Sequence, residues 1–189
     1  MRITGGSLKG RKVGVYKGSL DIRPAMDSMR ESVFAILGDL SGSSFLDLFS
    51  GSGVIALEAS SRGADPVVCV EKDTLKFPLL LANVSIADRR IECHSIPVER
   101  FLLRNRVGYS LVFIDAPFPY PWRRELLDKL GTGSTVAMNG RVLIHYPKED
   151  RLQDRTGRLV LEDERSYGRS LVRFYRADST IDAWKEGSG

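Results

Sequence analysis

The sequence predicts an α/β fold with a doubly wound, mostly parallel sheet that ends in an antiparallel hairpin. Short apolar, β-branched runs alternate with helix-forming segments from Ser44 to His145, which is typical of helices on both faces of a parallel sheet. The last two strand-like runs have no helix between them. A Gly-Ser-Gly turn follows the first strand directly, within FLDLFSGSGVIALE at Phe45 to Glu58. The expected architecture is therefore Rossmann-like.

The amino-terminal region precedes this alternation. Met1 to Tyr16 carries short β-type runs around glycines, which predicts a small hairpin or an extended arm. The first helix is expected to begin at Ser28, which has the spacing of a capping box with Glu31, and to end at Gly38. Arg30 then falls in the first turn, where a cation opposes the helix dipole, so it is either a functional residue or a partner of Glu31 or Asp27. We expect three parts: 1–24 as a basic arm or hairpin, 25–176 as the main domain, and 177–189 as a frayed tail.

The remaining elements follow from apolar periodicity and from their flanking residues. The expected strands are 45–49, 67–70, 91–94, 111–114 and 141–145, and the expected helices are 54–61, 79–86, 98–104 and 122–130. Pro78 suits the first turn of its helix because its missing N–H is not needed there. Segments 158–161 and 170–175 flank the turn-like Tyr167-Gly168 and predict the closing hairpin.

Composition indicates a globular protein with a bias toward nucleic acid. The 189 residues are 42% hydrophobic and 28% charged, with 28 Lys and Arg against 24 Asp and Glu. The excess of basic residues lies in the first thirty residues, which favours a nucleic acid over a membrane, although a solvated arm without a partner has the same composition. No long apolar run or leader is present, so we expect a cytoplasmic protein.

Cys69 and Cys93 fit no metal or disulfide pattern and are expected to be reduced core residues. The lone histidines His94 and His145 are interpreted as structural.

The glycine-rich turn predicts a nucleotide-type cofactor site. Gly51 and Gly53 satisfy the G-x-G-x-x-[GA] pattern, Asp47 lies at the end of the first strand, and Glu71 follows the second. This layout suits NAD and equally S-adenosylmethionine, because either ribose needs a carboxylate acceptor. It excludes a P-loop, since no Lys-Ser or Lys-Thr follows the glycines. A turn without a ligand has the same local pattern.

The tetrapeptide Asp115-Ala116-Pro117-Phe118 follows the fourth expected strand. The Asp115 carboxylate and the Ala116 carbonyl can each accept a hydrogen bond from an exocyclic amine, and Phe118 can stack on a planar base. A proline-terminated surface turn is the alternative interpretation. Together with the glycine turn, the tetrapeptide favours transfer of a group to an amine.

These motifs resemble the RsmD family of 16S rRNA guanine-N2 methyltransferases. The matching pieces are GGSLKGRK (5–12), RPAMDSMRESVFAIL (23–37), FLDLFSGSGVIALEASSRGA (45–64), VEKD (70–73), Asn83 and DAPF (115–118). The resemblance implies a class I S-adenosylmethionine-dependent methyltransferase that acts on 16S rRNA or on a small-subunit assembly particle, as a monomer and without a metal. Two departures stand out: Ala116 replaces the usual first proline, and no acid follows the third strand.

Site residues follow from the motifs and the resemblance. The cofactor candidates are Asp47, Phe49, Gly51, Gly53, Glu71, Lys72, Ser95 and Ile96. The catalytic candidates are Asp115, Ala116, Pro117 and Phe118, and the candidates for RNA phosphate contacts are Lys9, Arg11, Lys12, Arg23 and Arg30. Three alternatives stay open: an adenine-N6 methyltransferase on DNA or RNA, a catalytically weak RNA-binding relative, and an NAD oxidoreductase, for which no hydride-transfer residues are evident.

Overall fold

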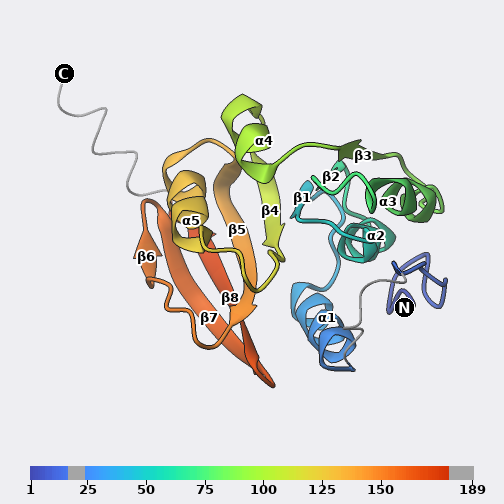
Figure 1. Cartoon of the computed structure of the whole chain (residues 1–189), viewed down its shortest axis with the longest axis horizontal. Helices are drawn as coiled ribbons and strands as arrows, with labels where there is room; N and C mark the ends of the chain where they lie inside the picture. Colours follow the sequence, from blue (N-terminus) through green and yellow to red (C-terminus); the bar gives the residue numbers. More distant parts are fainter. Residues whose placement is uncertain (17–23, 179–189) are drawn as a thin grey trace. The chain divides into compact units, whose positions relative to one another are not determined.

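The structure is a computed structural model that describes residues 1–16 and 24–178, with side chains from residue 27 onward in the first helix. The chain divides into two compact units, Met1–Phe101 and Leu102–Gly189 (Figure 1). Arg23 lies outside the described residues, as does nearly all of the expected tail. The boundaries expected for the arm, the main domain and the tail stay predictions.

The first unit contains a parallel three-stranded sheet in the order β3-β2-β1. Its strands are β1 (Phe45–Leu48), β2 (Val67–Val70) and β3 (Ile91–His94), and their first residues align in register. Every residue of β1 and β2 is buried, as expected for a parallel strand covered on both faces. All three strands lie within one residue of their expected positions.

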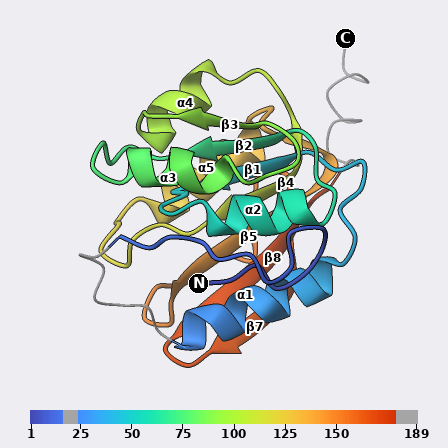
Figure 2. The same cartoon turned by 90° about the vertical axis from the view of Figure 1, so that its right-hand side faces the viewer.

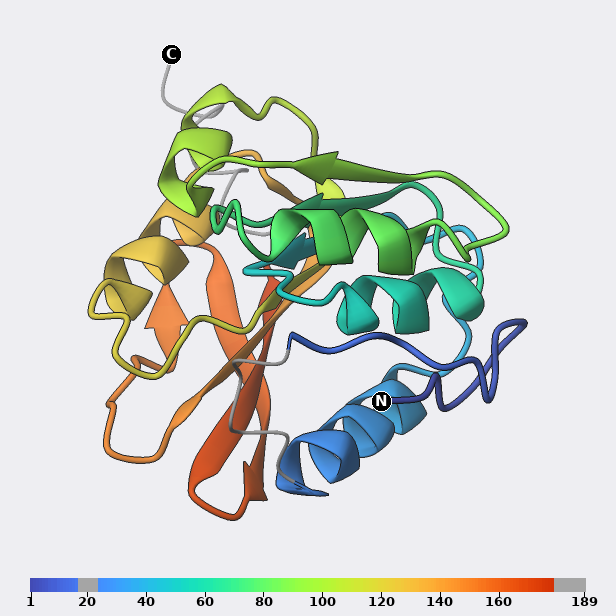
Figure 3. The ribbon, with the colours of Figure 1, turned by 45° about the vertical axis from the view of Figure 1, so that its right-hand side comes forward.

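Three helices belong to the first unit: α1 (Pro24–Leu37), α2 (Val54–Ser61) and α3 (Phe77–Val84). Helix α4 (Val98–Arg104) spans the boundary between the two units. Helix α2 packs on β1 and β2 and also contacts α1 and α3, and Figure 3 shows α2 and α3 side by side. Its residues are buried almost all round the helix, which matches its apolar sequence. Helix α2 and the turn before it are therefore held from several sides.

Helix α1 begins at Pro24, so the expected start at Ser28 is wrong. Proline is suited to the first helical position because its φ is already helical and its missing N–H would have no partner there. Ser28 and Glu31 consequently lie inside the helix and form no capping box. Arg30 sits in the middle of the helix, where the argument from the helix dipole does not apply.

The amino-terminal arm forms the expected hairpin-like structure. Arg2 and Lys12 make an antiparallel bridge, and the backbone N–H of Val13 donates to the carbonyl of Met1 at 2.9 Å. The arm lies along α1 and α2 (Figure 2), and it buries the side chains of Ile3, Leu8 and Val13. The arm therefore packs on the rest of the first unit through a small apolar face.

The second unit contains a five-stranded sheet in the order β4-β5-β8-β7-β6. The strands are β4 (Tyr109–Ile114), β5 (Val136–Pro147), β6 (Arg155–Thr156), β7 (Leu159–Tyr167) and β8 (Ser170–Ala177). Strands β4 and β5 are parallel, whereas β5-β8-β7-β6 are antiparallel, so the expected hairpin is confirmed. Helix α5 (Arg123–Thr132) packs against β6, a short strand that the sequence did not predict.

Candidate active site

The turn between β1 and α2 uses the left-handed backbone conformation three times. Phe49, Gly51 and Gly53 have φ of 65°, 53° and 77°. A Cβ at Gly53 would lie 2.5 Å from Leu80 Cδ1 and 3.0 Å from Val84 Cγ1, so this glycine permits close packing of the turn on α3. A Cβ at Gly51 would meet only the Phe49 carbonyl oxygen, at 4.0 Å. The turn is thus packed at Gly53 and open at Gly51, which leaves room for a ligand.

Glu71 holds the open side of this turn. Its Oε2 accepts the N–H of Gly51 at 2.8 Å, its Oε1 accepts the N–H of Asp73 at 2.8 Å, and the residue is 7% exposed. A carboxylate has about four lone-pair sites, so two remain available for ligand hydroxyls. The expected acceptor is therefore present beside the open glycine.

The other cofactor candidates cluster at the carboxyl ends of the same strands. The register pairs Leu48 with Val70 and Val70 with His94, so the residues that follow them lie at one edge of the sheet. Phe49 and Ile96 are half-buried there, while Lys72 and Ser95 are exposed. The structure thus brings the turn and the two later loops together at that edge, as the sequence predicts.

Asp47 lies on β1 itself and is 1% exposed. It is in register with Cys69, and Cys69 is in register with Cys93. Both cysteines are free; Cys69 is buried and Cys93 is half-buried. A hydrogen bond to Cys93, burial and the negative charge of Asp47 all raise the pKa of the Cys69 thiol. The strand below the turn is therefore a packed, reduced core.

Asn83 joins the arm to the glycine turn. Its Nδ2 donates to the carbonyls of Ser52 at 2.8 Å and Gly14 at 3.0 Å, and its Oδ1 accepts the N–H of Gly14 at 2.9 Å. The side chain is 8% exposed. In the sequence, Asn83 was identified only as one residue of the family resemblance. In the structure, its side chain links the backbone of Gly14 in the arm to the backbone of Ser52 in the glycine turn.

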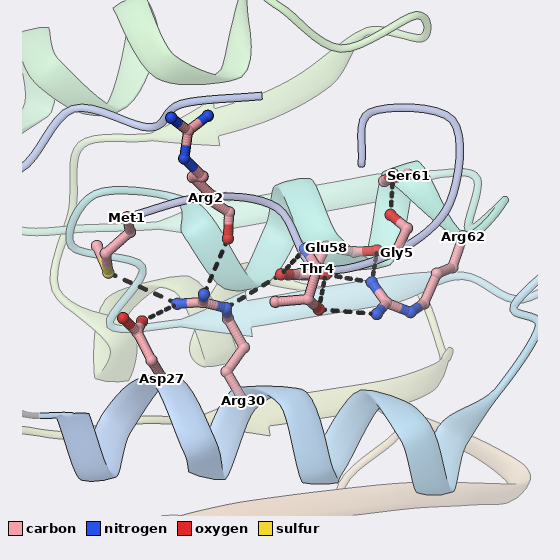
Figure 4. Close-up of polar contacts among 9 residues, drawn as sticks. All are labelled: Met1, Arg2, Thr4, Gly5, Asp27, Arg30, Glu58, Ser61 and Arg62. Carbon is pink, nitrogen blue, oxygen red and sulfur yellow. Dashed lines mark hydrogen bonds and ion pairs between the residues drawn. The ribbon is translucent and has the colours of Figure 1, made fainter. Parts of the chain in front are cut away.

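A buried carboxylate anchors the amino-terminal arm (Figure 4). Glu58 is 0% exposed; its Oε1 accepts the Thr4 N–H at 2.8 Å and the Nε–H of Arg30 at 3.0 Å. Its Oε2 accepts the Thr4 hydroxyl at 3.0 Å and pairs with Arg62. One carboxylate from α2 is thereby shared by the arm, by α1 and by the end of α2.

Arg30 belongs to this anchor. Its Nη1 donates to Asp27 at 2.8 Å, one of the two ion-pair partners that the sequence left open, and its Nη2 donates to the Arg2 carbonyl at 2.9 Å. The residue is 3% exposed. Because its guanidinium is buried and engaged by protein groups, Arg30 does not suit the RNA phosphate contact expected from the sequence.

The other basic candidates in the described part of the chain face solvent. Lys9, Arg11 and Lys12 are all exposed on the arm. Lys9 and Lys12, together with Arg2, line an open groove of about 780 Å³ between the arm and α1. These side chains remain candidates for phosphate contacts, and Arg23 lies outside the described residues.

The tetrapeptide follows β4 in the second unit. Oδ1 of Asp115 lies 2.8 Å from Nδ1 of His145, and the Asp115 side chain is 23% exposed. Ala116 is 2% exposed, whereas Phe118 is 42% exposed. The N–H of Tyr120 donates to the Pro117 carbonyl at 2.8 Å and closes the turn. The segment therefore presents a carboxylate and an aromatic ring around a buried alanine.

The buried side chain of Arg123 binds the backbone of this turn. It is 3% exposed and its Nη1 pairs with Asp150 at 2.7 Å. Its guanidinium donates to the carbonyls of Pro117 at 2.6 Å, Tyr120 at 2.6 Å, Phe118 at 3.1 Å and Ala116 at 3.5 Å. The Ala116 carbonyl is the most distant of these acceptors, so it keeps capacity for a further donor. Arg123 thereby constrains the backbone of the tetrapeptide turn.

Sequence reasoning missed the roles of Arg123 and His145. A basic residue in the first turn of a helix opposes the helix dipole, and Arg123 stands at the first position of α5, so this signal was available. Asp115 and His145 both lie at the ends of expected strands, and parallel strands align their carboxyl ends, so this signal was available too.

Among the described residues, no group of three His, Cys, Asp or Glu side chains could hold a metal ion.

The parallel strands, the glycine turn and the acidic residue after β2 define the fold of class I S-adenosylmethionine-dependent methyltransferases. The chain belongs to the family described as Conserved hypothetical protein 95, whose model matches residues 1–176. No helix in residues 1–16 or 24–178 is long and apolar enough to cross a membrane.

Named relatives agree with this assignment. The chain is 27% identical to ribosomal RNA small subunit methyltransferase D of Escherichia coli, over 95% of this chain and 91% of that protein. It is 28% identical to ribosomal RNA small subunit methyltransferase D of Haemophilus influenzae, over 80% and 81%. The solved structure of yhhF from E. coli superposes with a TM-score of 0.85 at 27% identity, covering 95% of this chain and 99% of that one. These similarities confirm the resemblance to the RsmD family.

Proposed function

We propose that this protein transfers a methyl group from S-adenosylmethionine to the exocyclic N2 amine of a guanine in 16S rRNA. The observation that carries the proposal is the tetrapeptide Asp115–Phe118, which combines a partly exposed carboxylate with an exposed aromatic ring on a turn fixed by Arg123. The likeness to RsmD proteins over nearly the whole chain supports the choice of rRNA as substrate.

The first unit fits the cofactor. The backbone is open at Gly51, and the Glu71 carboxylate beside it retains lone pairs that can accept the ribose hydroxyls. Phe49, Lys72, Ser95 and Ile96 would surround the rest of the molecule at the same sheet edge, with Asp47 in the core below. S-adenosylmethionine supplies an electrophilic methyl group when it is bound.

The tetrapeptide prepares the amine. A guanine N2 is a weak nucleophile because its lone pair is delocalised into the ring. Asp115 and the Ala116 carbonyl accept hydrogen bonds from the amine and hold its lone pair toward the methyl donor, and Asp115 takes the proton that the nitrogen loses. The base must leave its stack to be reached, and Phe118 offers a surface on which it can stack, worth about 1–3 kcal/mol.

The arm binds the RNA backbone. Lys9, Arg11 and Lys12 are exposed cations on a segment held rigidly by the Glu58 anchor. Phosphate contacts of this kind position an RNA without reading its sequence. The proposal includes 16S rRNA or a small-subunit assembly particle as the substrate, a monomeric enzyme and a cytoplasmic location.

Methyl transfer to small-subunit rRNA by purified protein tests the proposal. Wild-type protein is expected to transfer the methyl group, Asp115→Ala is expected to be inactive, and both are expected to bind S-adenosylhomocysteine equally. Glu71→Ala should weaken that binding. Wild-type activity retained in Asp115→Ala would refute the assigned role.

A further inference from the structure

His145 is a buried histidine that contacts the tetrapeptide and that the proposed mechanism does not use. It is 3% exposed, its Nδ1 lies 2.8 Å from Asp115 Oδ1, and its Nε2 lies 2.7 Å from Ser170 Oγ. Both ring nitrogens therefore have a polar partner inside the protein. A buried imidazole held at both nitrogens has one fixed orientation.

The sheet register produces this contact. Strand β4 pairs with β5 in parallel, with Ile114 opposite Ile144, so the next residues, Asp115 and His145, are neighbours at the strand ends. Strand β8 runs antiparallel to β5 and brings Ser170 to the other side of the imidazole. His145 and Ser170 thus lie on strands, and Asp115 directly follows β4, so the pairing of β4, β5 and β8 positions all three residues.

The hydrogen-bond partners determine which ring nitrogen carries a proton. An ionised carboxylate only accepts, so the contact with Asp115 requires an N–H at Nδ1 of His145. Ser170 Oγ lies 3.0 Å from the Tyr167 carbonyl, to which its hydroxyl can donate, and it then accepts an Nε2–H. If the hydroxyl instead donates to Nε2, Nδ1 still carries its proton. Either arrangement places an N–H against Asp115 Oδ1.

His145 also contacts the aromatic end of the tetrapeptide. The rings of Phe118 and His145 lie 5.7 Å apart, centroid to centroid, with an interplanar angle of 60°. This tilted arrangement is a favourable one for aromatic pairs. One side chain therefore touches both functional groups of the tetrapeptide, the Asp115 carboxylate and the Phe118 ring.

We propose that His145 is a positioning residue that orients the Asp115 carboxylate through an Nδ1–H hydrogen bond, with Ser170 fixing the imidazole, and so leaves Oδ2 of Asp115 directed to the substrate amine. This inference rests on the proposed function. It assigns Oδ1 to the protein and Oδ2 to the substrate. It also explains why a buried histidine directly after the apolar run Val142–Ile144 contacts an acid.

Nitrogen-15 NMR of the imidazoles tests the hydrogen bond without reference to activity. The chain has two histidines, so the His94→Asn variant assigns the signals of His145. We expect Nδ1 of His145 to be protonated at neutral pH in the wild-type protein and its signal to shift in Asp115→Asn. An imidazole protonated only at Nε2 would overturn the proposal.

Kinetics of a matched pair of variants tests the positioning. In His145→Asn the amide nitrogen can replace Nδ1 as the donor to Asp115, whereas in His145→Gln the longer side chain places its amide toward Ser170. We expect kcat of His145→Gln to fall about 10- to 100-fold, the range for a lost hydrogen bond to a charged group. His145→Asn should recover most of this loss, and KM should change by less than about twofold in both.

Two controls separate the possible failures. His94→Asn, which removes the histidine paired with Glu92 on β3, should keep wild-type kinetics. Equal kcat values for both His145 variants, in protein that still binds S-adenosylhomocysteine, would overturn the proposal. If wild-type protein does not methylate rRNA, the proposed function fails, and the NMR result alone then decides whether His145 orients Asp115.

Discussion

Nε of Arg30 lies 3.0 Å from Oε1 of Glu58, and both side chains are buried. Arg30, which the sequence suggested as an RNA contact, is therefore part of the anchor that holds the arm on α1 and α2. Removing one partner of a buried ion pair is costly because the other charge loses its compensation.

Arg30→Ala should therefore destabilise the protein without a direct effect on RNA contacts. We expect the free energy of unfolding in urea to fall by about 3 kcal/mol, the lower end of the range for breaking a buried pair, since Arg62 still compensates Glu58. Arg11→Ala, an exposed cation on the same arm, is the control and should change stability by less than about 0.5 kcal/mol. Equal stabilities of the two variants would contradict the anchor.

The exposed arm should govern the salt dependence of RNA binding. Each phosphate contact that is lost lowers the slope of log K against log salt by about 0.7 to 0.9. Combined alanine substitutions at Lys9, Arg11 and Lys12 should therefore weaken binding and flatten the slope by about 2. Lys148→Ala, an exposed lysine of the second unit, serves as the control. An unchanged slope in the triple variant would place the RNA elsewhere.

Asn83 should connect the arm to cofactor affinity. Asn83→Ala leaves the Ser52 carbonyl and both backbone groups of Gly14 without this partner, which costs about 1–3 kcal/mol per unsatisfied buried group. We expect calorimetry to show S-adenosylhomocysteine binding weakened about tenfold. Ser85→Ala, at the exposed end of α3, should bind as the wild type does. Undiminished affinity in Asn83→Ala would show that the turn needs no support from Asn83.

Arg123 should matter for turnover more than for cofactor binding. Arg123→Met keeps the apolar stem but removes the donors to the tetrapeptide carbonyls, so the turn loses its constraint. We expect kcat to fall at least about tenfold, with the affinity for S-adenosylhomocysteine unchanged. The neighbouring Arg124→Ala is the control, because within the described residues Arg124 donates to the exposed Arg151 carbonyl and not to the tetrapeptide. A wild-type kcat in Arg123→Met would show that turnover does not depend on the hydrogen bonds of Arg123 to the tetrapeptide.

Much of the fold was predictable because its signals are local. Short, mostly apolar runs between turn signals identify β1 and β2, and the G-x-G pattern identifies the turn before α2. The start of α1 was wrong because two local signals competed, and Pro24 prevailed over the Ser28 and Glu31 spacing. Strand β5 extends beyond the expected 141–145 at both ends because pairing with β8 and β4, which is not local, determines its length.

The candidate site was predictable only where chemistry and sequence position coincide. Glu71 follows β2 and Asp115 follows β4, so the place of each at the carboxyl end of its own strand follows from the alternation. The contact of Arg30 with Glu58 was not predictable because Glu58 is remote in the sequence and carries no pattern of its own. The contacts of His145 were not predictable for the same reason, since Asp115 follows β4 and Ser170 begins β8, both remote from His145 in the sequence.

Modification mapping of ribosomal RNA by mass spectrometry is the most direct test of Asp115-dependent N2 methylation of a guanine in small-subunit rRNA. RNA from cells that lack this protein is compared with RNA from the same cells supplied with wild-type protein or with Asp115→Ala. We expect an N2-methylguanosine in the small-subunit rRNA to disappear without the protein, to return with the wild type and not to return with Asp115→Ala. A change in N6-methyladenosine instead, or an unchanged set of modifications, would contradict it.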